Sequence, residues 1–365
     1  MTEKIYNGLR LMKSILSDEP SYMVLFITAV CNARCEFCFY WEEIESAKSK
    51  LELTPEEYQK ISLHLNHLYY LSIGGGEPFI RRDIFQIIEM FYTNSNTRTV
   101  AIASHGGFPN RTKEFLSFIQ QKCPSLKVKI QLSLDNLYEK HDQSRKVEGL
   151  FDNLLKSCSV ITEMKNKGAN VMLTIGTVLT PENRNDIKAI KDFLDKNVSY
   201  DDLSLIYPRG NAKDQNLLKV SISEYRAAKK IFEATTQPVN FYTKLYREID
   251  KEGKLGVEQY LEKGEKGYPW ICAAGQKMVT LFERGNVTPC EMLPQMNLKE
   301  NTNIGNVRNF NYDIPYMLRS EKGSAIRNFI VDTHCSCSYE CAALCNAALN
   351  KRSWPKILKN TIFST

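Results

Sequence analysis

Eleven cysteines are unevenly spread along the chain, and their spacing indicates metal chemistry. Three lie in the run Cys31-Asn32-Ala33-Arg34-Cys35-Glu36-Phe37-Cys38, and six lie between Cys272 and Cys345. Three thiolates on a tight loop can bind three irons of a [4Fe–4S] cluster, which leaves the fourth iron free for a substrate-like molecule. Zinc is the alternative, but a structural zinc site usually takes four protein ligands and no nearby His or Cys supplies the fourth. The first run therefore favours an iron–sulfur cluster.

A second motif, Gly74-Gly75-Gly76-Glu77-Pro78, follows the next apolar run. Three glycines free the backbone for positive φ and let a ligand approach closely. Their backbone groups, together with the Glu77 carboxylate, are suited to bind an ammonium group. A plain glycine-rich turn is the alternative for this motif taken alone.

Strands and helices are expected to alternate from Tyr22 to about Thr235, and these elements must position the two motifs. Segments of helical period separate six apolar runs typical of strands: Met23–Thr28, Tyr69–Ile73, Val100–Ala103, Val128–Leu134, Val171–Leu179 and Leu203–Tyr207. The helix expected over Leu53–Tyr70 has the clearest start, because Thr54 and Glu57 form a capping box. Six βα units predict a parallel sheet that right-handed crossovers curve into a partial barrel. Both motifs follow strands, at the edge where such barrels carry their active sites.

CxxxCxxC after the first strand and GGGEP after the second resemble the radical S-adenosylmethionine superfamily, over about residues 21–235. The resemblance implies an α/β fold with a partial (β/α)6 TIM-like barrel. It also implies that the amine and carboxylate of S-adenosylmethionine chelate the unique iron of the cluster at Cys31, Cys35 and Cys38. Reduction then yields a 5′-deoxyadenosyl radical, which abstracts hydrogen from a substrate.

The same resemblance implies contacts to S-adenosylmethionine, which can be matched residue by residue. The methionine amine is assigned to Gly74, Gly75, Gly76 and Glu77, the ribose and carboxylate to Ser133 and Asp135, the carboxylate also to Arg145, and the adenine site to Phe39. Phe37 matches the aromatic residue that precedes the third cysteine and counts among the cofactor-binding residues. A surface arginine is the alternative for Arg145. At the third strand this chain reads Ser104-His105-Gly106, where many relatives read Thr-Asn-Gly. Ser104 remains a candidate contact. His105 is either a substrate-facing acid or base, or a structural residue.

The C-terminal cysteines form a second group of candidate ligands. Cys272 and Cys290 flank an expected hairpin, Met278–Phe282 and Val287-Thr288, which Gly285 is placed to turn. The other four are Cys335, Cys337, Cys341 and Cys345. If Tyr339–Asn350 is helical, Cys341 and Cys345 lie at i and i+4 on one face.

The hairpin resembles the SPASM or Twitch extension of a radical S-adenosylmethionine subfamily, a small cysteine-rich α+β region. That resemblance implies one or two auxiliary [4Fe–4S] clusters, with all six C-terminal cysteines as candidate ligands. Zinc, or buried thiols without a metal, are the alternatives. Cys158 lies mid-helix among apolar residues and reads as a core thiol, and Cys123 has no evident partner.

Three regions follow from these patterns: a helical lead-in over residues 1–20, the barrel over 21–235, and the auxiliary cluster domain over 236–365. The net charge of +6 is mild for 365 residues and does not indicate nucleic-acid binding. No apolar run reaches the ~18 residues of a membrane span, and residues 1–20 lack a signal-peptide pattern. A cytoplasmic location is therefore expected, and with it a reducing compartment in which thiols are not paired as disulfides.

The function expected from the resemblance is radical modification of a ribosomally made peptide or of a protein side chain. Oxidation or epimerisation of a small molecule, such as an amino sugar, is the second reading, and a non-catalytic metal-binding scaffold is the third. An enzyme of this kind needs an electron donor such as a flavodoxin or a ferredoxin.

Overall fold

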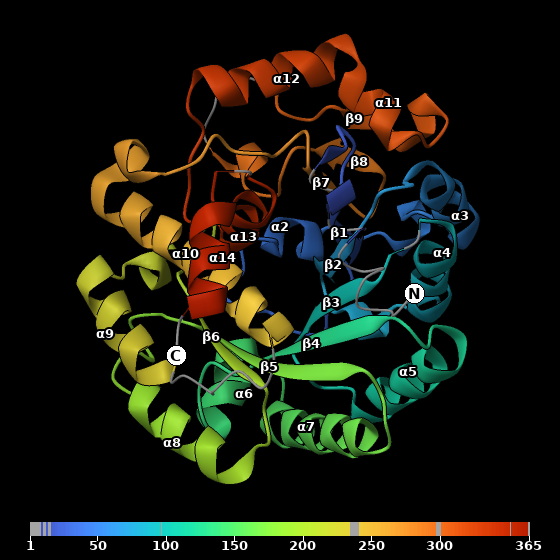
Figure 1. The fold of residues 1–365 in the computed structure, drawn as a ribbon. Helices are drawn as coiled ribbons and strands as arrows, with labels where there is room; N and C mark the ends of the chain where they lie inside the picture. The colour runs from blue at the N-terminus through green and yellow to red at the C-terminus, as the bar shows by residue number, and fades with distance from the viewer. Residues whose placement is uncertain are drawn as a thin grey trace.

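In the computed structural model, one nine-stranded sheet runs through the molecule in the order β6-β5-β4-β3-β2-β1-β7-β8-β9 (Figure 1). The structure describes residues 16–95, 97–233, 241–296, 301–350 and 352–363, together with Leu9, Met12 and Lys13. The first six strands pair in parallel along the chain order, and they are β1 (Tyr22–Thr28), β2 (Tyr70–Gly75), β3 (Thr99–Ser104), β4 (Lys127–Ser133), β5 (Val171–Val178) and β6 (Asp202–Ile206). The six apolar runs of the sequence are therefore the six strands. The predicted α/β fold with a partial (β/α)6 barrel is confirmed.

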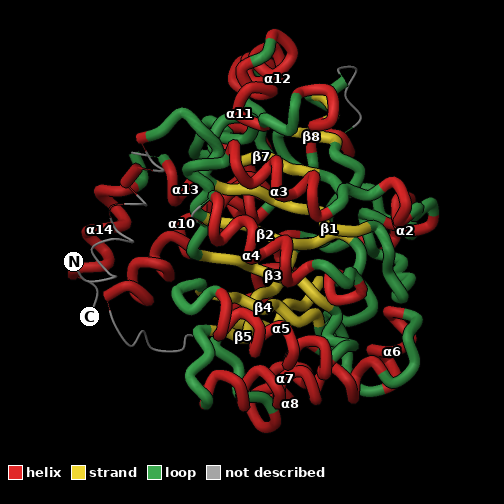
Figure 2. The backbone as a smooth tube through the Cα atoms, turned by 90° about the vertical axis from the view of Figure 1, so that its right-hand side faces the viewer, coloured by secondary structure: helices red, strands yellow, loops and turns green. Residues whose placement is uncertain are grey.

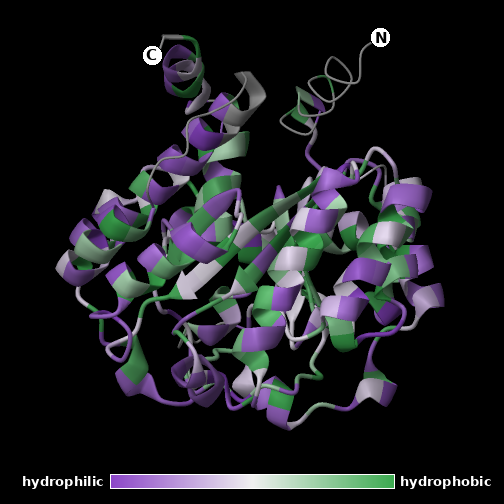
Figure 3. Cartoon of the chain, turned by 90° about the horizontal axis from the view of Figure 1, so that it is seen from below, coloured by the Kyte–Doolittle hydropathy of each residue, from purple (hydrophilic) through white to green (hydrophobic). Residues whose placement is uncertain are grey.

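Helices cover the outer face of this sheet, as an arc from the side of β2 round to β6 (Figure 1). They are α3 (Pro55–His64), α4 (Ile84–Asn94), α5 (Pro109–Lys122), α7 (Leu150–Asn166), α8 (Ile187–Asn197) and α9 (Ile222–Phe232), with the short α2 (Trp41–Glu45) and α6 (Glu139–Arg145) on the loops. Their apolar faces turn toward the strands and their polar faces outward, as the hydropathy colouring shows (Figure 3). This burial of apolar stripes against the sheet drives the assembly of the barrel.

Local capping fixes where α3 begins. The Thr54 hydroxyl accepts a hydrogen bond from the Glu57 backbone N–H at 3.3 Å, and the Glu57 carboxylate accepts one from the Thr54 N–H at 2.8 Å. The predicted capping box is therefore present. The helix ends at His64, six residues before the end of the predicted range, because the chain must turn there to enter β2.

The C-terminal part continues the barrel sheet. β7 (Met278–Leu281) pairs in parallel with β1, and the predicted hairpin follows through β8 (Asn286–Thr288), which pairs antiparallel with β7 and with β9 (Gly305–Asn306). The strands stack as one continuous layer when the molecule is seen edge-on (Figure 2). The hairpin was predicted correctly, whereas its junction with the first strand was not foreseen.

The remaining helices lie around this extension: α10 (Phe241–Lys263), α11 (Ile314–Arg319), α12 (Glu321–Asp332), α13 (Glu340–Leu349) and α14 (Trp354–Phe363). α10 and α13 lie beside β6 (Figure 1), where Gly253 lets α10 approach closely, since a Cβ there would meet the Leu344 backbone at 3.2 Å. A small apolar cluster around Trp270 joins α10, α13 and α14. These helices therefore cover the side of the partial barrel that the six strands leave open.

The division into three regions stays a prediction. The boundary expected near residue 235 falls within residues 234–240, and most of the helical lead-in also lies outside the described residues. No helix among the described residues is both long and apolar enough to cross a bilayer.

Candidate active site

A cavity of about 670 Å³ opens at the carboxyl ends of the parallel strands and reaches into the barrel. Residues from β1 to β6 line one side, and α10 and α13 line another through Asp250, Lys254, Tyr339, Glu340 and Cys341. Nearly all of the site residues predicted in the barrel also line it: Cys31, Cys35, Phe37, Cys38, Phe39, Gly74, Gly75, Gly76, Glu77, Ser104, Ser133 and Arg145. The fold thus brings both motifs to one cavity. Asp135 is the exception, since it lies buried behind the lining.

The three cysteines of the first run are half-buried on the loop after β1. Burial raises the pKa of Cys31 to about 11 and that of Cys38 to about 12, and each of these thiols also feels the charge of Cys35. No three Cys, His, Asp or Glu side chains in the described part of the chain converge on a single-ion site. In a cubane each cysteine ligates a different iron, so three cysteines leave the fourth iron open. Binding of a [4Fe–4S] cluster by this loop stays a prediction.

The glycine strip serves two distinct purposes. A Cβ on Gly76 would lie 2.3 Å from the Val30 carbonyl oxygen, and one on Gly75, whose φ is +108°, would lie 2.5 Å from that of Thr28. These two glycines are required because the strip packs against the start of the cysteine loop. A Cβ on Gly74 would meet no atom within 4 Å. Only Gly74 therefore leaves open space toward the cavity, where a ligand can approach the backbone.

Glu77 is 2% exposed and organises the ends of β2 and β3. Its carboxylate accepts hydrogen bonds from the Ser104 hydroxyl at 2.9 Å and from the His105 backbone N–H at 2.9 Å. The His105 Nδ1 accepts from the Gly107 N–H at 2.9 Å, so Nε2 carries the proton and donates to Asn32 Oδ1 at 2.8 Å. Burial lowers the pKa of His105, which favours this neutral form. The contacts support the structural reading of His105, because it ties the cysteine loop to β3.

Arg145 ends α6 and forms a buried ion pair with Asp135. Its Nε and one terminal nitrogen donate to the same Asp135 oxygen at 2.9 and 2.5 Å, and the other Asp135 oxygen accepts from the Val178 N–H at 2.9 Å. No described residue hydrogen-bonds the second terminal nitrogen of Arg145. The Arg145 guanidinium also lies 5.6 Å from the Phe37 ring centre. The geometry gives Asp135 the role of holding Arg145 in place, and a direct ligand contact by Asp135 remains a prediction.

The cavity has a second wall, which the sequence did not reveal. Arg209 follows β6 and forms ion pairs with Glu340 at the start of α13 and with Glu291 at 3.8 Å. Its guanidinium lies 4.8 Å from the Tyr339 ring centre. Burial raises the pKa of Glu291, and the positive charge of Arg209 opposes that rise. The sequence could have indicated this wall only through the position of Arg209 just after the sixth strand, since catalytic side chains of such barrels come from strand ends.

All six C-terminal cysteines lie near one another. Burial raises the pKa of Cys335 and Cys337 to about 12 and also raises those of Cys290 and Cys345, and charge on Cys272 adds to each rise. Charge on Cys341 adds further to the rise at Cys345. Of the six, Cys341 also lines the cavity. Cys123 and Cys158 are buried in the main core, as expected for Cys158.

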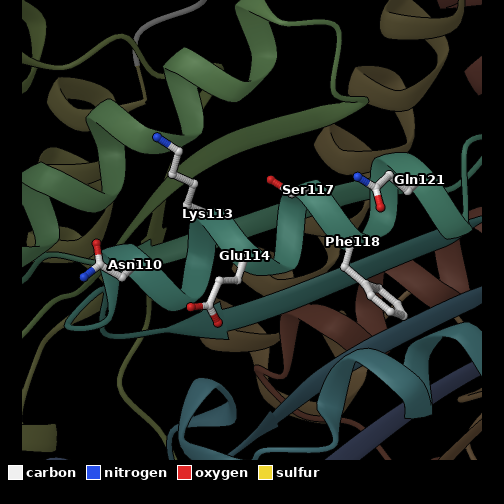
Figure 4. A pocket seen from close by; sticks show the side chains of 6 residues that line it. All are labelled: Asn110, Lys113, Glu114, Ser117, Phe118 and Gln121. Carbon is white, nitrogen blue, oxygen red and sulfur yellow. The ribbon is translucent and has the colours of Figure 1, made fainter.

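A shallow second hollow lies on the outer side of α5, lined by Asn110, Lys113, Glu114, Ser117, Phe118 and Gln121. Figure 4 shows these side chains along one helix. The hollow contains neither cysteine nor histidine, and it is formed by this single helix. The chemistry therefore belongs to the barrel cavity.

Residues 25–194 match the model of the Radical SAM superfamily. The matched stretch contains the cysteine loop and the glycine strip of the barrel. A match to this superfamily implies a [4Fe–4S] cluster and S-adenosylmethionine as cofactors.

Curated relatives match only part of the chain. GTP 3′,8-cyclase of Alkaliphilus oremlandii (strain OhILAs) is 33% identical over 129 residues, which is 34% of this chain and 38% of that protein. Molybdenum cofactor biosynthesis protein moc-5 of Caenorhabditis elegans is 28% identical over 172 residues, which is 46% of this chain and 27% of that protein. The chain therefore spans well under half the length of these relatives.

Solved structures match nearly the whole chain. SuiB of Streptococcus suis bound to the precursor peptide SuiA superposes with a TM-score of 0.56 at 19% identity, over 89% of this chain and 70% of that one. The structure of anSMEcpe with bound AdoMet gives a TM-score of 0.56 at 15% identity, over 94% of this chain and 99% of that one. At these identities the likeness shows a common fold, which includes the C-terminal part.

Proposed function

We propose that this protein cleaves S-adenosylmethionine at a [4Fe–4S] cluster bound by Cys31, Cys35 and Cys38. The observation that carries the proposal is that these cysteines, the open face of Gly74 and the Arg145 guanidinium all border one cavity. When bound, the reduced cluster supplies the electron that cleaves the sulfonium to a 5′-deoxyadenosyl radical. The non-catalytic scaffold is disfavoured because both motifs are complete and adjacent.

The residues of the chain orient S-adenosylmethionine in this proposal. The second terminal nitrogen of Arg145 binds the methionine carboxylate, because Asp135 fixes the guanidinium and leaves that nitrogen available. Charge-assisted pairing of this kind is the strongest class of hydrogen bond in such a site. Glu77 and Ser104 hold the ends of their strands in register, and Ser133, Phe37 and Phe39 complete the lining.

The substrate is placed against the second wall, beside Arg209 and Glu291. We propose a peptide or protein side chain, since the SuiB structure of the same fold is bound to a precursor peptide. Modification of a small molecule is the second candidate, favoured by the curated relatives named GTP 3′,8-cyclase. At least one auxiliary [4Fe–4S] cluster on the C-terminal cysteines and an external flavodoxin or ferredoxin complete the proposal.

Deuterium transfer tests the proposed chemistry and the substrate class together. Anaerobically reconstituted protein is incubated with reductant, S-adenosylmethionine and either a deuterated candidate peptide or a deuterated small molecule, such as GTP or an amino sugar. The proposal predicts 5′-deoxyadenosine that carries deuterium only from the peptide. Label from the small molecule would establish the second candidate, and absence of 5′-deoxyadenosine under every condition would contradict the enzyme itself.

A further inference from the structure

Lys129 is a half-buried lysine of β4 that lines the cavity inside the barrel. No hydrogen bond or ion pair joins its Nζ atom to another residue in the part of the chain that the structure describes. Lysine is almost never buried in a protein unless it is paired. We propose that the Lys129 ammonium group binds an acidic group of the substrate, a carboxylate or a phosphate. The proposal rests on the proposed function for its bound molecule, and it adds a chemical requirement to that molecule.

Small side chains leave room beside Lys129. The strand register places Lys129 next to Ala101 of β3, and Ala101 next to Ser72 of β2. All three residues line the cavity. The interior of a βα barrel is normally filled by bulky branched side chains. Alanine and serine at these positions therefore open the barrel to a ligand at the level of Lys129.

Lys129 lies deeper in the barrel than the residues proposed to bind S-adenosylmethionine. Ser133, the last residue of β4, follows it by four positions, which corresponds to about 13 Å along an extended strand. Gly74 and Arg145 lie at or beyond the carboxyl ends of their strands. A group bound to Lys129 is therefore further inside the barrel than a cofactor held at those two residues.

The acidic groups near Lys129 do not pair with it. Burial raises the pKa of Asp202, and the charge of Lys129 opposes that rise without direct contact. The Asp250 carboxylate pairs with Lys254 at 2.9 Å, and Lys254 also pairs with Glu233 at 3.0 Å. The ammonium group of Lys129 therefore keeps its donors for a ligand, and a charge-assisted hydrogen bond to an acidic group is of the strong kind.

A second lysine strengthens the preference for an anion. Lys127 lies two positions before Lys129, so both side chains lie on the same face of β4. Burial lowers the pKa of Lys127, and the charge of Lys129 lowers it further. An acidic group bound beside Lys129 reduces this repulsion.

Amine labelling of the wild-type holoprotein tests the anion site without knowledge of the substrate. Pyridoxal 5′-phosphate is an anionic aldehyde that forms an imine with a lysine amine and releases water, and cyanoborohydride reduces the imine to a stable amine that mass spectrometry locates. We expect Lys129 to be labelled, and excess pyrophosphate or N-acetylglutamate to reduce that labelling about tenfold by mass action. Labelling of the exposed Lys188 is the control and should not change. Absence of label at Lys129, or label that neither anion reduces, would overturn the proposal.

Paired substrates test the contact in turnover and distinguish a carboxylate from a phosphate. One arm compares a glutamate-containing peptide with its glutamine analogue, and the other compares GTP with guanosine. Lys129→Gln should raise KM for the acidic form about tenfold, as expected for the loss of one hydrogen bond to a charged group, and Lys129→Arg should restore most of it. The neutral form should have a high KM that neither variant changes.

An equal rise in KM for the acidic and neutral forms would show that Lys129 only supports the fold. Turnover of an amino sugar without any acidic group, in preference to both arms, would also contradict the proposal. If no 5′-deoxyadenosine forms under any condition, the proposed function fails, and the labelling result alone then decides whether Lys129 binds an anion.

Discussion

In the proposed function, the Arg145 side chain serves both the fold and the ligand. Its pair with Asp135 is buried on both sides, and it joins α6 to the ends of β4 and β5. The Arg145 backbone carbonyl also accepts a hydrogen bond from the Arg34 N–H at 3.0 Å, inside the cysteine loop. Loss of Arg145 therefore removes the proposed ligand contact and also leaves the buried Asp135 carboxylate without its partner.

A double variant separates these two effects. Arg145→Ala should weaken S-adenosylmethionine binding by about 1.5–3 kcal/mol, the usual value of a hydrogen bond to a charged group, and should destabilise the fold by roughly 3–5 kcal/mol. Arg145→Ala combined with Asp135→Ala removes both charges and should recover most of the stability but none of the affinity. Calorimetric titration and urea unfolding measure the two quantities. Wild-type affinity in either variant would exclude Arg145 from the ligand site.

His141 makes the stability of the barrel depend on pH. Burial, aided by the nearby charge of Arg145, lowers its pKa to about 3, whereas an unfolded histidine titrates near 6.5. Below pH 6.5 His141 is protonated in the unfolded chain but stays neutral in the folded chain, so the free energy of unfolding falls as pH falls.

The expected loss from His141 alone is roughly 2 kcal/mol between pH 7 and pH 5. His141→Leu should flatten this dependence, measured by urea unfolding at both pH values. An unaltered slope in His141→Leu would show that His141 does not titrate in this way.

At the scale of elements, the glycine strip joins the cysteine loop to the second strand. The Gly76 N–H donates to the Thr28 carbonyl at 2.7 Å, and the Glu77 N–H donates to the Val30 carbonyl at 3.0 Å. These bonds extend the pairing of β1 and β2 beyond the last residues of the strands. They hold the loop that begins at Cys31 against the strip.

Alanine substitutions along the strip should differ sharply. Gly76→Ala places a methyl group against the Val30 backbone and should cost at least about 1–3 kcal/mol of stability, with a loss of cluster on reconstitution. Gly74→Ala should fold and bind iron like the wild type, because its Cβ meets no atom, but should bind S-adenosylmethionine less tightly. Urea unfolding, iron content and ligand titration provide the comparison. Equal stability of the two variants would contradict the packing role of Gly76.

The sequence was most informative where structure is local. The apolar runs gave the six strands, the Thr54 capping box gave the start of α3, and the spacing of Cys31, Cys35 and Cys38 gave the loop, because each depends on neighbouring residues. Contacts between residues that are far apart in the sequence could not be predicted in this way. The contact of β7 with β1 joins residues 256 positions apart, and the wall around Arg209 depends on where α13 packs.

At the scale of the whole molecule, the two cysteine-rich regions are parts of one rigid framework. The Tyr40 hydroxyl, just after the cysteine loop, donates to the buried Glu283 carboxylate at 2.5 Å, at the turn of the β7–β8 hairpin. Together with the β1–β7 pairing, this bond holds the hairpin against the barrel. The hairpin next to the C-terminal cysteines is therefore joined directly to the barrel, which suits the proposed role of an auxiliary cluster in chemistry on a substrate.

The central claim is that Cys31, Cys35 and Cys38 hold the cluster at which S-adenosylmethionine is cleaved. The most direct measurement is reductive formation of 5′-deoxyadenosine by the wild type and by a variant with all three cysteines replaced by Ala. The account predicts that this variant forms no 5′-deoxyadenosine and keeps its auxiliary iron, about four atoms for each auxiliary cluster. Undiminished cleavage in a folded triple variant would contradict the account.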